Sequence, residues 1–147
     1  MRARLKAPRR LATIGNPMSY PDIDEARGSH AALKEVFAHH RGDWTAGGEE
    51  LRRVEQLCRD AAAAVDDPQC REEIGIVGDY AAELFARGEH RKWESESMSG
   101  AEFLRLQILK ALDSFHSRLY SIEAIRRAGD RQLYPFTPRV RGGERAP

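Results

Sequence analysis

Apolar and polar residues alternate at helical spacing over most of the chain between residues 22 and 128. The clearest pattern lies in residues 99–128, where apolar residues recur every three or four positions and therefore fall on one face of a helix. The residues on this face are Leu104, Ile108, Ala111, Phe115, Leu119 and Ile122, with Ala101 and Leu112 beside them. The pattern predicts one long helix, roughly 45 Å in length at about 1.5 Å per residue.

Local signals mark both ends of this long helix. Ser99 and Glu102 have the spacing of a capping box, and Met98 with Phe103 has the spacing of a hydrophobic staple across the first turn. Gly129 predicts the end of the helix, because glycine readily adopts the backbone conformation that terminates helices.

Three shorter helices are expected before the long one. They span residues 22–40, 47–65 and 68–87, and each has an apolar stripe at the same spacing. Between the second and the third, Asp67 and Pro68 predict an immediate restart, since aspartate caps helices and proline is tolerated in the first helical position. So short a connection favours an antiparallel hairpin of helices.

No segment alternates convincingly at period two, so the sequence predicts an all-α protein: a four-helix bundle with one longer C-terminal helix and extended basic N- and C-terminal arms. The expected organisation is a basic arm over residues 1–21, a helical bundle domain over 22–128 and a Pro/Arg-rich tail over 129–147. Gly75 and Gly78 are costly inside the third helix, and a close contact with another helix is the expected compensation.

The net charge of +1 hides an asymmetry along the chain. Residues 1–21 carry +5 and residues 126–147 carry +4, which leaves −8 for the residues between them. The basic tail also begins where the long helix is expected to outreach its neighbours, so this end and both arms are the candidate partner-binding region. The candidate residues are Arg2, Arg4, Lys6, Arg9, Arg10, Tyr120, Arg126, Arg127, Tyr134, Phe136, Arg139 and Arg141.

The sequence contains no convincing motif for catalysis or for metal binding. No glutamate is followed three residues later by a histidine, as a di-metal carboxylate bundle requires, and no nucleophile motif or phosphate-binding glycine loop occurs. Cys58 and Cys70 are interpreted as reduced, buried small apolar residues. We therefore expect a protein that is not an enzyme and needs no cofactor or metal.

Two groups of titratable residues leave alternatives open. His30 lies on the apolar stripe of the first helix, where a partly buried structural histidine is favoured over the sharper interpretation, half of a polar or ligand site with His116. Glu72, Asp79 and Glu83 share one side of the third helix, where a solvated face is favoured over catalytic carboxylates.

The leading hypothesis from the sequence is a helical interaction or assembly subunit that binds a protein partner or itself through its long helix and basic arms. The alternative is a nucleic-acid-associated accessory protein whose arms contact phosphates. Protein docking is favoured, because no aromatic residue is interleaved among the N-terminal arginines and the acidic body repels phosphate. No apolar run is long enough for a membrane span and no secretory signal is recognisable, so we expect a cytoplasmic location and no membrane partner.

Overall fold

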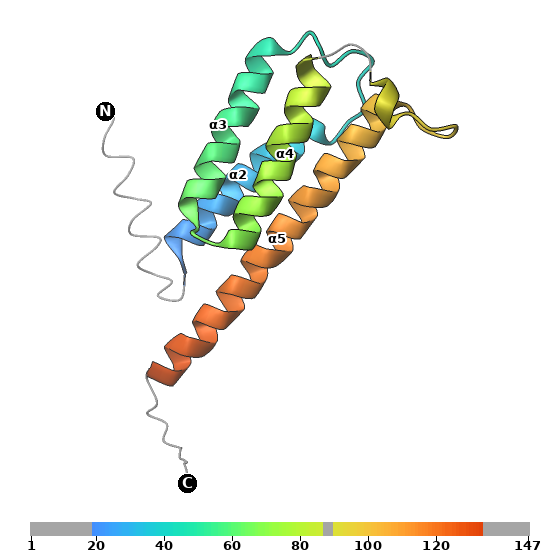
Figure 1. Cartoon of the computed structure of the whole chain (residues 1–147). Helices are drawn as coiled ribbons and strands as arrows, with labels where there is room; N and C mark the ends of the chain where they lie inside the picture. Colours follow the sequence, from blue (N-terminus) through green and yellow to red (C-terminus); the bar gives the residue numbers. More distant parts are fainter. Residues whose placement is uncertain (1–18, 87–89, 134–147) are drawn as a thin grey trace, which may run out of the picture. The chain divides into compact units, whose positions relative to one another are not determined.

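The computed structural model describes residues 19–86 and 90–133, so the predicted arm up to residue 18 and the tail from residue 134 lie outside the described residues. In this part of the chain the predicted all-α fold is confirmed (Figure 1). Its elements are α2 (Pro21–Phe37), α3 (Gly48–Ala64), α4 (Pro68–Ala86), a short 3-10 helix η2 (Arg91–Trp93) and α5 (Gly100–Leu133).

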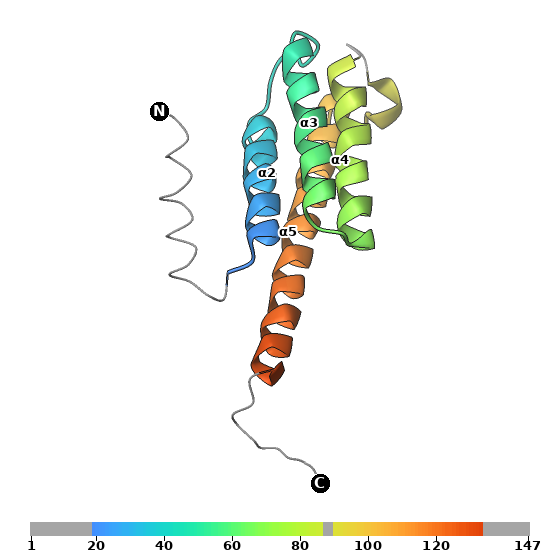
Figure 2. The same ribbon diagram turned by 90° about the vertical axis from the view of Figure 1, so that its left-hand side faces the viewer.

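The described residues fall into two compact units. Residues 22–120 form one unit, and residues 19–21 with 121–133 belong to the other. Figures 1 and 2 show that, in the first unit, α2, α3, α4 and the first part of α5 lie alongside one another and that successive helices run in opposite directions. This is the predicted bundle, with α5 as its longest helix.

The predicted apolar stripes form the core of the first unit. Among its fully buried side chains are Ile23, Leu33, Phe37, Val54, Val77, Leu84, Leu104, Ile108, Phe115 and Leu119. Full burial of a side chain of this size contributes about 1.5–3 kcal/mol, so the stripes account for the cohesion of the helices. Cys58 and Cys70 are buried and free, as predicted, and burial raises the pKa of their thiols to about 11 and about 12.

The predicted cap between α3 and α4 is confirmed and has an additional partner. The Asp67 carboxylate accepts a hydrogen bond from the Cys70 amide at 2.9 Å, which caps α4. The same carboxylate accepts two hydrogen bonds from Arg118 of α5, at 3.1 Å from Nε and 2.9 Å from Nη2. Arg118 is the main reason why the pKa of Asp67 falls to about 2. The turn is therefore tied to α5 by a paired charge.

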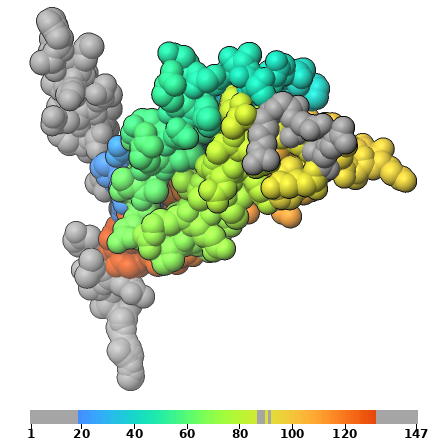
Figure 3. All heavy atoms as spheres, turned by 45° about the horizontal axis from the view of Figure 1, so that its top comes forward, coloured from blue at the N-terminus to red at the C-terminus, as the bar shows by residue number. Residues whose placement is uncertain are grey.

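Aromatic side chains close the other end of the bundle. Trp93 of η2 stacks on Phe103 with ring centroids 5.4 Å apart and meets the ring of Tyr80 edge-on at 5.6 Å. In Figure 3 part of the yellow segment that follows α4 lies beside this helix, and its tip projects away from the bundle. A Cβ atom at Gly100 would lie 1.9 Å from the carbonyl oxygen of His90, so this crossing admits no side chain at position 100.

The expected close contact at Gly75 and Gly78 is wrong. A Cβ atom built at either glycine meets nothing within 4 Å apart from the backbone of its own helix and its chain neighbours. Gly75 is exposed and Gly78 is half-buried. Neither glycine is therefore required by packing against another helix.

The predicted ends of two helices are also corrected. α2 ends at Phe37 instead of residue 40, because a side chain from α5 takes over its last carbonyls, as described below. α5 continues through Gly129 to Leu133. On either side of this glycine, the Asp130 carboxylate accepts a hydrogen bond from the Tyr20 hydroxyl and the Arg126 guanidinium lies 5.6 Å from the Tyr20 ring centroid. These contacts support a helical turn where the glycine alone favours an end.

The start of α5 matches one half of the predicted capping box. The Ser99 hydroxyl accepts a hydrogen bond from the Glu102 amide at 3.1 Å, as a capping serine should. The Glu102 side chain, which would complete the box by turning back to the Ser99 amide, is instead bonded to Arg105 and His40. A tertiary contact has replaced the local one.

Candidate interaction surface and polar sites

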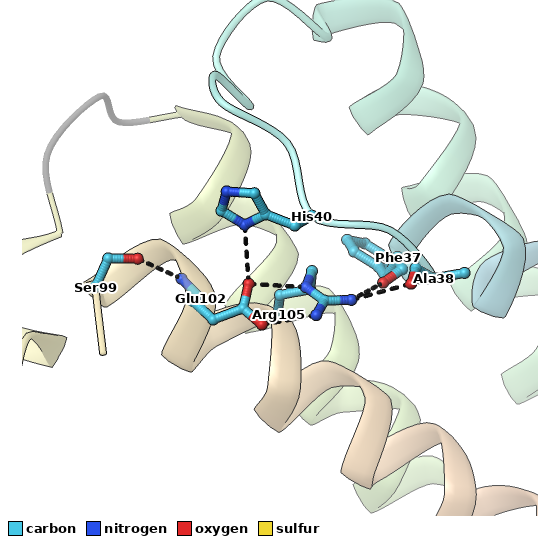
Figure 4. A network of polar contacts seen from close by, with 6 residues as sticks. All are labelled: Phe37, Ala38, His40, Ser99, Glu102 and Arg105. Carbon is cyan, nitrogen blue, oxygen red and sulfur yellow. Dashed lines mark hydrogen bonds and ion pairs between the residues drawn. The ribbon is translucent and has the colours of Figure 1, made fainter. Parts of the chain in front are cut away.

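A polar network connects the start of α5 to the end of α2, and Figure 4 shows its members. Arg105 donates hydrogen bonds from Nη1 to the carbonyl oxygens of Phe37 and Ala38, at 2.9 and 3.1 Å. Its Nε and Nη2 atoms donate to the two carboxylate oxygens of Glu102 at 3.0 and 2.6 Å, and Nδ1 of His40 lies 3.0 Å from Oε1 of Glu102.

This network has the properties of a helix cap. The last carbonyls of a helix have no partner within the helix, and Arg105 supplies donors to two of them. The pKa of the Glu102 carboxyl is lowered, mainly by its hydrogen bond with Arg105, so the pair stays charged well into the acid range. His40 is 62% exposed, which places it at the edge of the network and off the apolar stripe. The network thus holds the end of α2 against the start of α5.

The structure brings His30 and His116 together, as the sharper of the two sequence-based interpretations requires. Their ring centroids are 4.7 Å apart with an interplanar angle of 27°, and the ring of Phe115 lies 6.3 Å from that of His30. His30 is only 8% exposed, whereas His116 is exposed. Two stacked rings present their faces to each other, which differs from nitrogen atoms converging on one ligand.

Burial and neighbouring charge both act on His30. Its pKa is lowered first by burial, then by the nearby His116 and Lys34, and these effects outweigh Asp113 and the Leu112 carbonyl, which raise it. The Nε2 atom of His30 has no hydrogen-bond partner among the described residues. His30 also lines a hollow of about 320 Å³ on α2 together with Ala31, Lys34, Glu35 and Ala38. The histidine is therefore held neutral in a site that suits the neutral ring.

The acidic residues that share one side of α4 are mostly exposed. On α4, Glu72 and Asp79 are exposed, and Glu83 lies 3.8 Å from the ammonium group of Lys92. This arrangement is typical of a solvated helix face. In residues 19–86 and 90–133 there is no group of three or more histidine, cysteine, aspartate or glutamate residues arranged to hold a metal ion.

Three of the candidate partner-binding residues lie within the described residues. Tyr120 is 68% exposed. Arg126 lies over the ring of Tyr20, and Arg127 donates a hydrogen bond from Nη2 to Glu123 at 3.1 Å. The other candidates lie outside the described residues: Arg2, Arg4, Lys6, Arg9, Arg10, Tyr134, Phe136, Arg139 and Arg141.

Ile125 is a surface residue that the sequence-based list omitted. It is 64% exposed and is one of three large apolar side chains that the described part of the chain leaves exposed. It follows Ile122 by three residues, so it lies about 60° from that residue around the helix, next to the stripe that Leu119 and Ile122 continue. Its spacing of three residues from Ile122 continues the apolar pattern of the helix, so Ile125 could have been identified from the sequence. Tyr120 lies about 140° from Ile125 around the helix and faces a different direction.

Comparison with protein-family models, with curated proteins and with solved structures finds no match for this chain. No helix within the described ranges has both the length and the apolar character needed to cross a membrane. The fold belongs to the class of four-helix bundles, and its function is inferred from its own residues.

Proposed function

We propose that this chain is a non-enzymatic helical subunit that associates with a second copy of itself or with another protein through the C-terminal part of α5, assisted by its basic arms. The observation that carries the proposal is the exposure of Ile125 beside a stripe that is buried up to Leu119. An apolar side chain left in water beside such a stripe gains free energy when a partner covers it.

The apolar pattern of α5 continues beyond its buried section. In the first unit the stripe from Leu104 to Leu119 is fully buried at its large side chains. In the second unit Ile122 is half-buried and Ile125 is 64% exposed, although both keep the spacing of the stripe. One amphipathic helix therefore has one section with a partner and one section with less cover, which favours an interaction role.

Charge supports a protein partner for this section. Arg126 and Arg127 flank the apolar positions. Arg127 is held by Glu123 of the same helix, and Arg126 lies over the ring of Tyr20. Apolar side chains surrounded by arginine are typical of protein interfaces, where arginine is enriched at the contact and lysine is depleted. The basic arms, which lie outside the described residues, would add long-range attraction for an acidic surface such as the body of this chain.

Light scattering after size exclusion tests the proposal on the full chain. We expect the average mass to rise above the 16.6 kDa of one chain as concentration increases. Ile125→Arg should abolish this rise, because an arginine at the centre of an apolar contact has to be desolvated without a partner. Ser117→Arg is the matched control, since it adds the same side chain at another exposed position of α5; it should leave the association unchanged.

The result that contradicts the proposal is equally defined. The proposal is contradicted if the chain stays at 16.6 kDa at every concentration and if, used as bait, it binds no protein that the Ile125→Arg variant fails to bind. Equal loss of association in Ile125→Arg and Ser117→Arg would show that added charge, and not the apolar contact, is responsible.

A further inference from the structure

The stacked pair of His30, which is buried, and His116, which is exposed, is a polar contact that the proposed interaction does not use. It joins the middle of α2 to α5, with ring centroids 4.7 Å apart. His30 is 8% exposed and its Nε2 atom has no hydrogen-bond partner in the described part of the chain. A neutral imidazole is tolerated in such a place, whereas an imidazolium would be a largely buried charge, which is costly.

The charged groups around His30 make its protonation more costly. On its own helix Lys34 is positive, and from α5 the ring of His116 adds a second group that can become positive. Asp113, also on α5, is the carboxylate that acts in the opposite direction. Burial and the two basic neighbours dominate, so the pKa of His30 lies below the usual value of 6.5.

We propose that the stacked His30–His116 contact is an acid-sensitive latch: it holds the first half of α2 in the bundle while the His30 ring is neutral and releases that half when His30 takes up a proton. The released half comprises residues 21–30, so that His30 itself becomes exposed, and it includes Ile23 and Ala26, which are fully buried in the closed bundle. Opening would therefore expose apolar surface in a pH-dependent way.

The other end of α2 stays in place in the same pH range. Arg105 holds the carbonyls of Phe37 and Ala38, and an arginine does not lose its charge at any pH of interest. Its partner Glu102 has a lowered pKa and remains ionised. The acid response is thus confined to one half of a helix, which distinguishes a latch from general acid unfolding.

The direction of the pH effect follows from linkage. Because the pKa of His30 is lower in the closed form than in the open form, the open form binds the proton first as pH falls. Above about pH 6.5 protonation does not favour the open form. Below that value the equilibrium constant for opening rises by at most about tenfold per pH unit, until the pH falls below the pKa of His30 in the closed form.

Hydrogen exchange of the full chain, measured by mass spectrometry between about pH 5 and pH 8 and corrected for intrinsic exchange, tests the latch. Peptides covering residues 21–30 should open more at the acid end, and peptides from α3 should not. His30→Phe keeps a stacking ring without a titrating nitrogen and should remove the pH dependence. His39→Gln, at an exposed histidine after the same helix, is the control and should retain it.

Two results would overturn the latch. One is an equal pH response in the wild-type chain and in His30→Phe, or an equal opening of α2 and α3. The other does not depend on any variant folding: a titration of the His30 ring protons by NMR in the wild-type chain whose midpoint is at or above that of the unfolded chain.

Discussion

The two glycines in the middle of α4 provide the most direct test of the helix packing. We predict that Gly75→Ala and Gly78→Ala each stabilise the protein, because an alanine methyl group at either position meets nothing within 4 Å outside its own stretch of helix. Glycine in a helix interior costs roughly 0.5–1 kcal/mol relative to alanine, largely through the conformational freedom it has in the unfolded chain.

The magnitude follows from the absence of a steric penalty. Each single variant should gain about 0.5–1 kcal/mol in the free energy of unfolding, and the double variant about 1–2 kcal/mol if the two methyl groups act independently. For a domain of this size a gain of about 1 kcal/mol corresponds to roughly 4 °C in melting temperature. Urea unfolding followed by far-UV circular dichroism measures the free energy, and an unchanged slope would show that the surface exposed on unfolding is the same in each variant.

Gly100→Ala is the control that should behave in the opposite way. Its methyl carbon would lie 1.9 Å from the backbone oxygen of His90, a clash that only a shift of the backbone can relieve. We expect a loss of at least about 1–3 kcal/mol, as for other overpacked sites. If Gly75→Ala or Gly78→Ala destabilised the protein, another helix would have to approach α4 more closely than the structure shows, and the packing described above would be wrong.

Three further predictions follow from polar and buried groups. Arg105→Met should cost about 1–3 kcal/mol in urea unfolding, because the last carbonyls of α2 lose their donors, whereas Arg52→Met at an exposed ion pair should cost less than about 0.5 kcal/mol. The free energy of unfolding, measured as a function of pH, should contain a contribution from the ionised Asp67 that is present above its unfolded pKa near 3.8 and is lost as pH falls toward about 2. We expect this contribution to be about 1–2 kcal/mol, because the arginine partner is partly exposed. Asp67→Asn should remove it. Cys58 and Cys70 should be unreactive toward a disulfide reagent at neutral pH in the folded chain and both reactive in denaturant, and fast reaction of either thiol in the folded chain would contradict their burial.

Periodicity predicted the helices and the buried face of α5, because a stripe at spacings of three and four can only be covered by packing on one side. Local chemistry predicted the Asp67 cap, since an N-cap contact joins residues three apart in sequence. Both predictions depend on interactions within a few residues. They therefore need no knowledge of the neighbouring helices.

The errors arose where partners are distant in sequence. Arg105 ends α2 through carbonyls 67 and 68 residues away, and no pattern near residue 40 reveals it. Gly129 carries a local signal for a helix end, yet Tyr20 meets the following residue, Asp130, from 110 positions away. Gly75 and Gly78 destabilise α4 relative to alanine, and this predicted a close helix contact in compensation. The structure has no such contact at either glycine.

The polar contacts between residues distant in sequence involve α5, which connects the other helices of the bundle. Along its first section, Arg105 reaches the end of α2, His116 stacks on the middle of α2, and Arg118 binds the cap between α3 and α4. These side chains flank a stripe of fully buried apolar residues, so polar contacts near both ends of the stripe accompany the apolar packing between them. Beyond Leu119 the apolar spacing persists while Ile125 stays largely exposed. A pattern that specifies neighbours along one section would specify a neighbour along the next, which is why Ile125→Arg, more than removal of either arm, distinguishes an assembly subunit from a solitary bundle.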